Sequence, residues 1–248
     1  MSSLKDLASL IMIPSLVKDG RLDTVKPLGN SIIHPDATGN NDGTDGSTPA
    51  EGNFTFSRGS NLAATRVDVN GLIEKGRENV LLQSNQFDTT WVKAGNGLAV
   101  LTTGQTGYDG SSNAWLFSKP SASFVGIYQD TSINGVITLS MYLKAGTNST
   151  AIVRIIGTND NQFFVNLSNG TSSFASSSII DYDIEDVGGG WYRTSISVNN
   201  SGSARVLLYP EAPFNATTAG NILIQDAQLE QGLVATPYIE TGASTAQA

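Results

Sequence analysis

Apolar and polar residues alternate along much of the chain, most clearly over residues 136–144. Odd-numbered positions there would face one side of a strand and even-numbered positions the other, with Ile137, Leu139, Met141 and Leu143 on the first side and Val136, Thr138, Ser140, Tyr142 and Lys144 on the second. The first side is apolar enough to form a core, and the second is open. The pattern therefore predicts a strand that is buried on one face.

Similar short segments recur from residue 54 onward, separated by clusters of Gly, Asn, Asp or Ser. They predict strands at residues 54–58, 63–69, 79–83, 98–102, 114–118, 126–130, 151–156, 162–167, 191–198, 204–209 and 221–229. No helical pattern lies between them, which favours antiparallel sheets over βαβ units. We expect an all-β antiparallel sandwich, and a jelly roll suits the length of 248 residues best. Its core should include Ile137, Leu139, Met141, Leu143, Phe163, Val165 and Leu167.

The N-terminal segment has the one helical pattern in the chain. Ser3 can cap a helix in which Leu4, Leu7 and Ile11 share one face, and Pro14 ends it. A helix of about three turns is marginal in water. These three side chains should therefore be buried, either against the sandwich or against another protein.

Polar residues dominate the chain between this helix and the strands. Residues 17–26 are compatible with an extended chain, and residues 39–47 are rich in Gly, Asn and Asp, as in a linker or a long loop. We therefore divide the chain into an N-terminal helix and extended arm, residues 1–50, and a β-sandwich domain, residues 51–248.

Composition and charge exclude several classes of function. Fourteen basic residues against 22 acidic ones give a net charge of −8, which is unfavourable for binding nucleic acid. The most apolar stretch, residues 7–16, is interrupted by Ser9 and Pro14 and is too short to span a membrane, and we expect no secretory leader. The absence of Cys removes thiol chemistry, and His34, the single histidine, lies in a polar stretch and is interpreted as a loop residue.

Several sequence blocks resemble bacteriophage structural proteins of the fibre and appendage type. In the N-terminal part they are LASLIMIPS (7–15), KDGRL (18–22), VKP (25–27), FTFSRGS (54–60), ATRV (64–67) and NGLIE (70–74). The blocks NVLLQSNQF (79–87) with Trp91, GWYR (190–193), AQLEQG (227–232) and TPYI (236–239) are similar to the phage version of a jelly roll that resembles carbohydrate-binding modules. Together the blocks touch almost the whole chain.

The resemblance implies a virion protein, assembled in the host cytoplasm, with a lectin-like sandwich. It also implies a homo-oligomer, most often a trimer, docked to other virion proteins through the N-terminal segment with Leu4, Leu7 and Ile11. Open-faced side chains such as Val136, Tyr142, Phe164 and Tyr209 are a physical reason to expect contacts between subunits. The resemblance does not imply that sugar binding occurs, because one fold serves many functions.

A sugar site on a sandwich needs exposed aromatic rings and planar polar side chains. The candidates on open strand faces are Tyr142, Lys144, Arg154, Phe164, Asn166, Arg205 and Tyr209. The alternative is that these side chains cover the sheet or contact neighbouring subunits. Trp91, Trp115 and Trp191 are interpreted as structural, because two of them stand at strand starts within the resemblance blocks.

Acidic residues form two further candidate groups. Asp36, Asp42 and Asp45 offer oxygen ligands for a structural calcium ion, although the stretch lacks the terminal glutamate of an EF-hand and an ordinary loop explains it equally. Asp181, Asp183, Glu185 and Asp186 could hold a glycosidase pair, and the first three would share one face if the stretch is a strand. Exposed acidic strand edges also deter edge pairing.

Three functions remain in competition. The leading one is a non-enzymatic virion structural protein of the fibre, appendage or decoration type, without a cofactor. The second is a receptor-binding module for host-surface glycans, and the third, ranked below both, is a glycan depolymerase.

Overall fold

The computed structural model describes residues 76–247 except 96, 123 and 214, together with four short strands nearer the N-terminus. The chain divides into two compact units, Met1–Ser57 and Arg58–Ala248. In the first, β1 (Pro14–Lys18) and β2 (Arg21–Thr24) form an antiparallel hairpin that takes in part of the stretch predicted to be extended. The predicted helix with Leu4, Leu7 and Ile11, the linker at 39–47, His34, and the calcium candidates Asp36, Asp42 and Asp45 lie outside the described residues.

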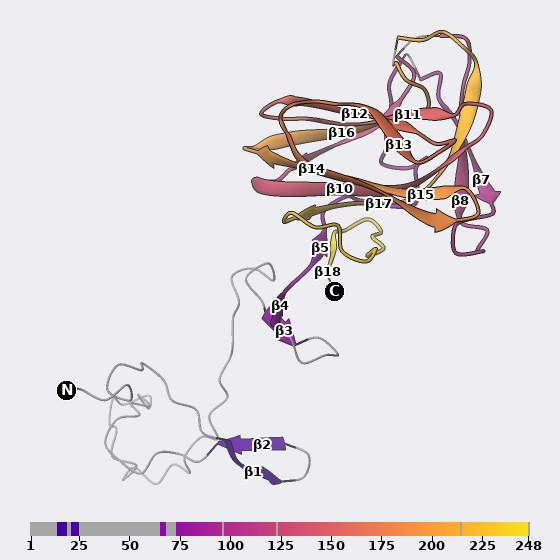
Figure 1. Cartoon of the computed structure of the whole chain (residues 1–248). Coiled ribbons are helices and arrows are strands. Elements are labelled where there is room, and N and C mark those ends of the chain that lie inside the picture. Colours follow the sequence, from indigo (N-terminus) through magenta and orange to yellow (C-terminus); the bar gives the residue numbers. More distant parts are fainter. Residues whose placement is uncertain are drawn as a thin grey trace. The chain divides into compact units, whose positions relative to one another are not determined.

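The second unit contains two six-stranded antiparallel sheets (Figure 1). The first sheet has the order β14 (Ile179–Gly188), β15 (Trp191–Asn200), β10 (Gly135–Ala145), β17 (Gly220–Gln231), β8 (Ala114–Lys119) and β7 (Val100–Gln105). The second has the order β13 (Thr171–Ala175), β12 (Asp160–Asn166), β11 (Thr150–Ile156), β16 (Ser203–Tyr209), β9 (Ile127–Ser132) and β6 (Val92–Lys93). Two small pairs accompany them, β5 (Glu78–Asn79) with β18 (Ala246–Gln247) and β3 (Thr65–Val67) with β4 (Ile73–Lys75). The predicted all-β sandwich is confirmed.

The core lies between the two sheets, where the alternation of the sequence places it. The odd-numbered residues of β10 and the inner residues of β12 are buried, and the cluster includes all seven predicted core residues: Ile137, Leu139, Met141, Leu143, Phe163, Val165 and Leu167. Trp91 and Trp115 belong to the same cluster, which confirms that they are structural. The residues 76–247 contain no helix that is long and apolar enough to cross a membrane.

Three strands of the two sheets were not predicted: β6, β13 and β14. Each stands at an edge of its sheet. An edge strand is exposed on more than one side, so its sequence needs no strict alternation of apolar and polar residues. This explains why the sequence of β13, TSSFA, does not predict a strand.

The C-terminal segment crosses the outer face of the first sheet. Thr138 Oγ1 donates a hydrogen bond to the carbonyl of Gly232 at 2.7 Å, and Ser197 Oγ donates to the carbonyl of Leu233 at 3.0 Å. Thr138 and Ser197 are themselves cross-strand partners, with their hydroxyls 2.7 Å apart. The segment therefore buries Thr138 to 1% exposure, and the expectation that this side chain is open is wrong.

The blocks that carry the sequence resemblance meet under and beside this segment. Asn79 Nδ2 donates to the carbonyls of Ala227 and Ile239, while its Oδ1 accepts from the amides of Leu81 and Leu229. Gln228 Oε1 accepts from the amide of Ile239. All of these groups are buried.

The AQLEQG and TPYI blocks contact each other directly. Both carboxylate oxygens of buried Glu230 accept from Thr236, one from its amide at 2.8 Å and the other from its hydroxyl at 2.6 Å. Arg193, from the GWYR block, donates to the carbonyl of Thr236. These residues are thus committed to holding the C-terminal segment on the sheet.

Candidate functional site

The seven predicted sugar-binding residues lie on two different sheets. Tyr142 and Lys144 are on β10 of the first sheet. The other five lie on the outer face of the second: Arg154 on β11, Phe164 and Asn166 on β12, and Arg205 and Tyr209 on β16. The two outer faces point away from each other across the core, so the seven residues cannot form one site.

Tyr142 is not an exposed platform. Its ring stacks on Tyr108 with 3.6 Å between centroids and 5° between planes, and it packs in a small cluster with Trp191 and Ala114. Tyr142 is 9% exposed and Trp191 is 2% exposed. Lys144 lies opposite Trp191 in the strand register.

Two arginine–aspartate pairs define the outer face of the second sheet. Arg154 on β11 donates from Nε and Nη2 to the two carboxylate oxygens of Asp160, both at 2.7 Å. Arg205 on β16 donates in the same way to Asp130 on β9, at 2.6 and 2.8 Å. In each pair the hydrogen bond from the guanidinium lowers the pKa of the carboxyl group, so both carboxylates stay ionised at neutral pH.

Aromatic rings lie beside these pairs. The Arg205 guanidinium stands 4.0 Å from the centroid of the Tyr128 ring, as in a cation–π contact. Phe164 packs against Phe174, with 5.1 Å between ring centroids, and Phe174 is 49% exposed. Buried apolar side chains, Ile152, Leu207 and Tyr209, lie at the base of this group. The face is therefore a layer of flat groups on an apolar base.

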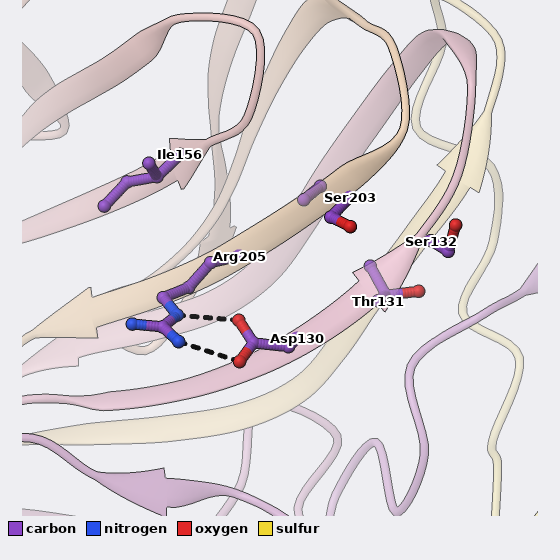
Figure 2. A pocket seen from close by; sticks show the side chains of 7 residues that line it. Asp130, Thr131, Ser132, Ile156, Ser203 and Arg205 are labelled. Atoms are coloured by element: carbon purple, nitrogen blue, oxygen red, sulfur yellow. Dashed lines mark hydrogen bonds and ion pairs between the residues drawn. The ribbon is translucent and has the colours of Figure 1, made fainter.

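A pocket of about 640 Å³ opens at one end of this face. Figure 2 shows Arg205 and Asp130 side by side on neighbouring strands, with Ile156 of β11 nearby and Ser203, Ser132 and Thr131 at the strand ends. Three hydroxyl groups, one carboxylate and one guanidinium thus line the pocket together with an aliphatic side chain. Such a lining can accept from and donate to a polyhydroxylated molecule.

Sequence reasoning found only part of this face. Asn166 is on it, but its side-chain oxygen accepts from the amide of Ser168 at 2.9 Å and so closes a turn. Tyr128 and Asp130 were not among the predicted site residues, although both lie in the predicted strand 126–130 at positions that alternation places on the outer face. Phe174 was missed because its strand, β13, was not predicted.

The acidic stretch at 181–186 is in β14, and the predicted sharing of one face is confirmed for three residues. Asp181, Asp183 and Glu185 line a second pocket of about 330 Å³ with Arg193 and Ser195 of β15. Among the described residues, no three His, Asp or Glu side chains converge in a way that could hold a metal ion.

The carboxyl group of Asp226, on the first sheet, is buried without an ion-pair partner among the described residues. Asp226 is 6% exposed and occupies a left-handed backbone conformation, φ 51°, where the register between β17 and β10 shifts. Tyr108 Oη donates to its Oδ2 at 3.0 Å. Burial raises the pKa of Asp226 to about 7, and the negative charges of Asp109 and Glu240 act in the same direction.

Comparison with known proteins gives no family for this chain. No protein-family model matches it, and no curated protein matches it. Solved structures give distant likenesses only.

One of these structures is the enzymatically active domain of tailspike protein 4 of bacteriophage CBA120, at 16% identity and a TM-score of 0.37 over 63% of this chain and 21% of that chain. Another is the module TmCBM61 in complex with β-1,4-galactotriose, at 14% identity and a TM-score of 0.40 over 61% of this chain and 97% of that chain. A third contains the CBM22-1 and GH10 modules of Clostridium thermocellum xylanase 10B with xylohexaose, at 12% identity and a TM-score of 0.38 over 62% of this chain and 28% of that chain. The sugars belong to those proteins, and the function of this chain is inferred from its own side chains.

Proposed function

We propose that this chain is a non-enzymatic phage virion protein whose sandwich binds a glycan on the outer face of the second sheet. The observation that carries the proposal is the layer of flat groups on that face: Tyr128 under Arg205, Phe164 beside exposed Phe174, and two bidentate arginine–aspartate pairs. The virion assignment is supported by the sequence resemblance, and the glycan assignment by this geometry.

The chemistry of the face suits sugars. The apolar face of a pyranose ring packs on aromatic rings, and its hydroxyls need planar groups that donate and accept. Each arginine–aspartate pair presents both kinds of group in a fixed geometry, which lowers the entropy lost on binding. The pocket beside Arg205 adds the hydroxyls of Ser132 and Ser203.

The same pairs argue against hydrolysis on this face. A glycosidase needs one carboxylic acid that is protonated at the working pH. Asp130 and Asp160 are both held ionised by their arginines, so neither can supply that proton. A binding module is the better interpretation of this face.

A symmetric homo-oligomer, with a trimer favoured, remains part of the proposal because of the resemblance. Its physical reason changes, since Tyr142 and Tyr209 are covered by side chains of their own subunit. The stronger reason is avidity: a shallow sugar site binds weakly, and linked copies raise the apparent affinity by about a hundredfold or more. Sedimentation of the full-length chain tests it, and a clean 26.0 kDa monomer at micromolar concentration would contradict it.

The N-terminal segment is proposed to dock the chain to other virion proteins, as the resemblance implies. Deleting residues 1–20 should leave the sandwich folded but absent from particles. Normal incorporation of the shortened chain would contradict the docking.

Glycan binding is tested on an array with the full-length protein and three variants. We expect Arg205→Ala and Phe174→Ala to weaken binding by about fivefold or more, because each removes a flat contact group. Lys144→Ala is the matched control on the other sheet and should bind like the wild type. Equal binding by all four proteins, or no binding by any, would contradict the proposed face, and release of reducing sugar would contradict the non-enzymatic assignment.

A further inference from the structure

The first sheet ends in a long open strand. β14 has ten residues and pairs with β15 on one side, and no described strand pairs with it on the other. Such an edge presents backbone N–H and C=O groups that do not pair with a neighbouring strand, and these can bind an added strand. On β14 the amides of Tyr182 and Gly188 donate instead to the side chains of Asp181 and Asp186.

The two faces of β14 have different chemistry. In the register with β15, Asp181, Asp183 and Glu185 lie opposite Ser197, Ser195 and Arg193, on the outer face. Tyr182 and Ile184 alternate with them, and the ring of Tyr182 packs 4.9 Å from that of the core residue Phe163. Tyr182 is nevertheless 50% exposed, and the preceding Ile180 is 52% exposed.

The three outer carboxylates have no ion-pair partner among the described residues. The register places Arg193 opposite Glu185, but its guanidinium instead donates to the carbonyl of Thr236 and to Ser140 Oγ. Arg193, which could neutralise this row of three carboxylates, thus holds the C-terminal segment instead. The negative charge of the row remains available to a partner.

The C-terminal segment supplies a second wall. Leu233 and Val234 are 51% and 72% exposed, and they line the 330 Å³ pocket together with the carboxylate row and Tyr182. Four of the chain's exposed large apolar side chains, Ile180, Tyr182, Leu233 and Val234, are therefore found on β14 and on the segment beside it.

We propose that β14 is the docking edge for an extended segment of another protein in which lysine or arginine alternates with apolar residues. Added as a strand, such a segment would place its basic side chains beside Asp181, Asp183 and Glu185 and its apolar side chains beside Tyr182 and Ile184. A second copy of this chain is a poor occupant, since it would bring carboxylate rows together on chains of net charge −8. The inference is independent of the proposed glycan face, which belongs to the other sheet.

The test uses a labelled nine-residue peptide that alternates lysine with valine, and fluorescence anisotropy with the full-length chain. The variant D181N/D183N should bind it more weakly, by a factor of up to about five, because two charge pairs are lost at a partly exposed site. The control D88N/E240Q changes the net charge equally at exposed positions elsewhere and should bind like the wild type. A peptide that alternates glutamate with valine should not bind.

Strand addition is separated from plain electrostatic attraction by N-methylation of the lysine peptide. Two versions carry methyl groups on alternate amides, so that each version blocks one edge of the peptide; one version should lose binding and the other should keep it. Loss of binding by one methylated peptide and not by the other, together with weaker binding by D181N/D183N, supports the proposal. Absence of binding, equal effects of the two double variants, or equal binding of both methylated peptides overturns it.

Discussion

The two outer faces of the sandwich are built from strands with similar alternation, yet one is covered and the other is open. On the first sheet, residues 232–241 lie over β10 and β15 and are held by Thr138, Ser197, Gln228 and Glu230. On the second sheet, Tyr128, Arg205 and Phe174 meet solvent, as do the aspartates beside them. The candidate binding chemistry is on the open face.

Side-chain size explains the difference. Outward positions of β10 and β15 include Thr138, Ser140, Ser195 and Ser197, whose small hydroxyl side chains leave room for a backbone and can donate to its carbonyls. Outward positions of the second sheet carry arginines and aromatic residues, which fill that space and pack on one another. A strand face of small hydroxyl residues can thus accommodate another segment of the chain, whereas the large flat side chains of the second sheet leave no room for one.

The largest expected effect is on the covered face and in the core beneath it. Leu139→Asp places a charge in the core and should lower the free energy of unfolding by about 4 kcal/mol or more. Thr138→Asp should cost about 3 kcal/mol, because it buries a charge opposite Glu230 and removes two hydrogen bonds. Ser203→Asp, exposed on the open face, should cost less than about 0.5 kcal/mol in the same urea titrations. A Thr138→Asp variant as stable as Ser203→Asp would show that the C-terminal segment does not cover this face.

A somewhat smaller effect is expected at Asn79. Asn79→Ala should lower the free energy of unfolding by about 2 kcal/mol, since four buried backbone groups lose their partner. Asn166→Ala on the open face removes one bond in a turn and should cost about 0.5 kcal/mol. Comparable losses for the two variants would remove the contrast between the faces.

The smallest effect expected is a pH dependence from Asp226. Its folded pKa of about 7 lies above the unfolded value of 3.8, so the folded state binds the proton more tightly. The stabilisation that Asp226 contributes should therefore be greatest below pH 4 and be lost as the pH rises through 7, by about 1 kcal/mol or more. Asp226→Asn should remove this fall and be the more stable protein at pH 8. Thermal unfolding of both proteins from pH 4.5 to 8 measures it, and parallel curves would refute the assignment.

The fold class could be predicted from the sequence because apolar and polar residues alternate along the main strands. This alternation placed the seven core residues, including Leu139 and Phe163, because each inner face must be apolar. It failed at β13 and β14, where an edge strand has little to bury. It also failed for Tyr142 and Thr138, whose outward direction was predicted correctly but whose burial depends on Tyr108, 34 positions away, and on Gly232, 94 positions away.

Local periodicity is enough to predict the fold class, the inward residues of the main strands and the outward direction of the side chains Arg154, Phe164, Arg205 and Tyr209. The folded chain is needed to show which outward face is open and which arginine meets which aspartate. It is also needed to show that the blocks around Asn79, Arg193, Gln228 and Thr236 hold the C-terminal segment. Each of these depends on contacts between residues far apart in the chain. A local pattern gives the direction of a side chain, but not what the rest of the chain brings to it.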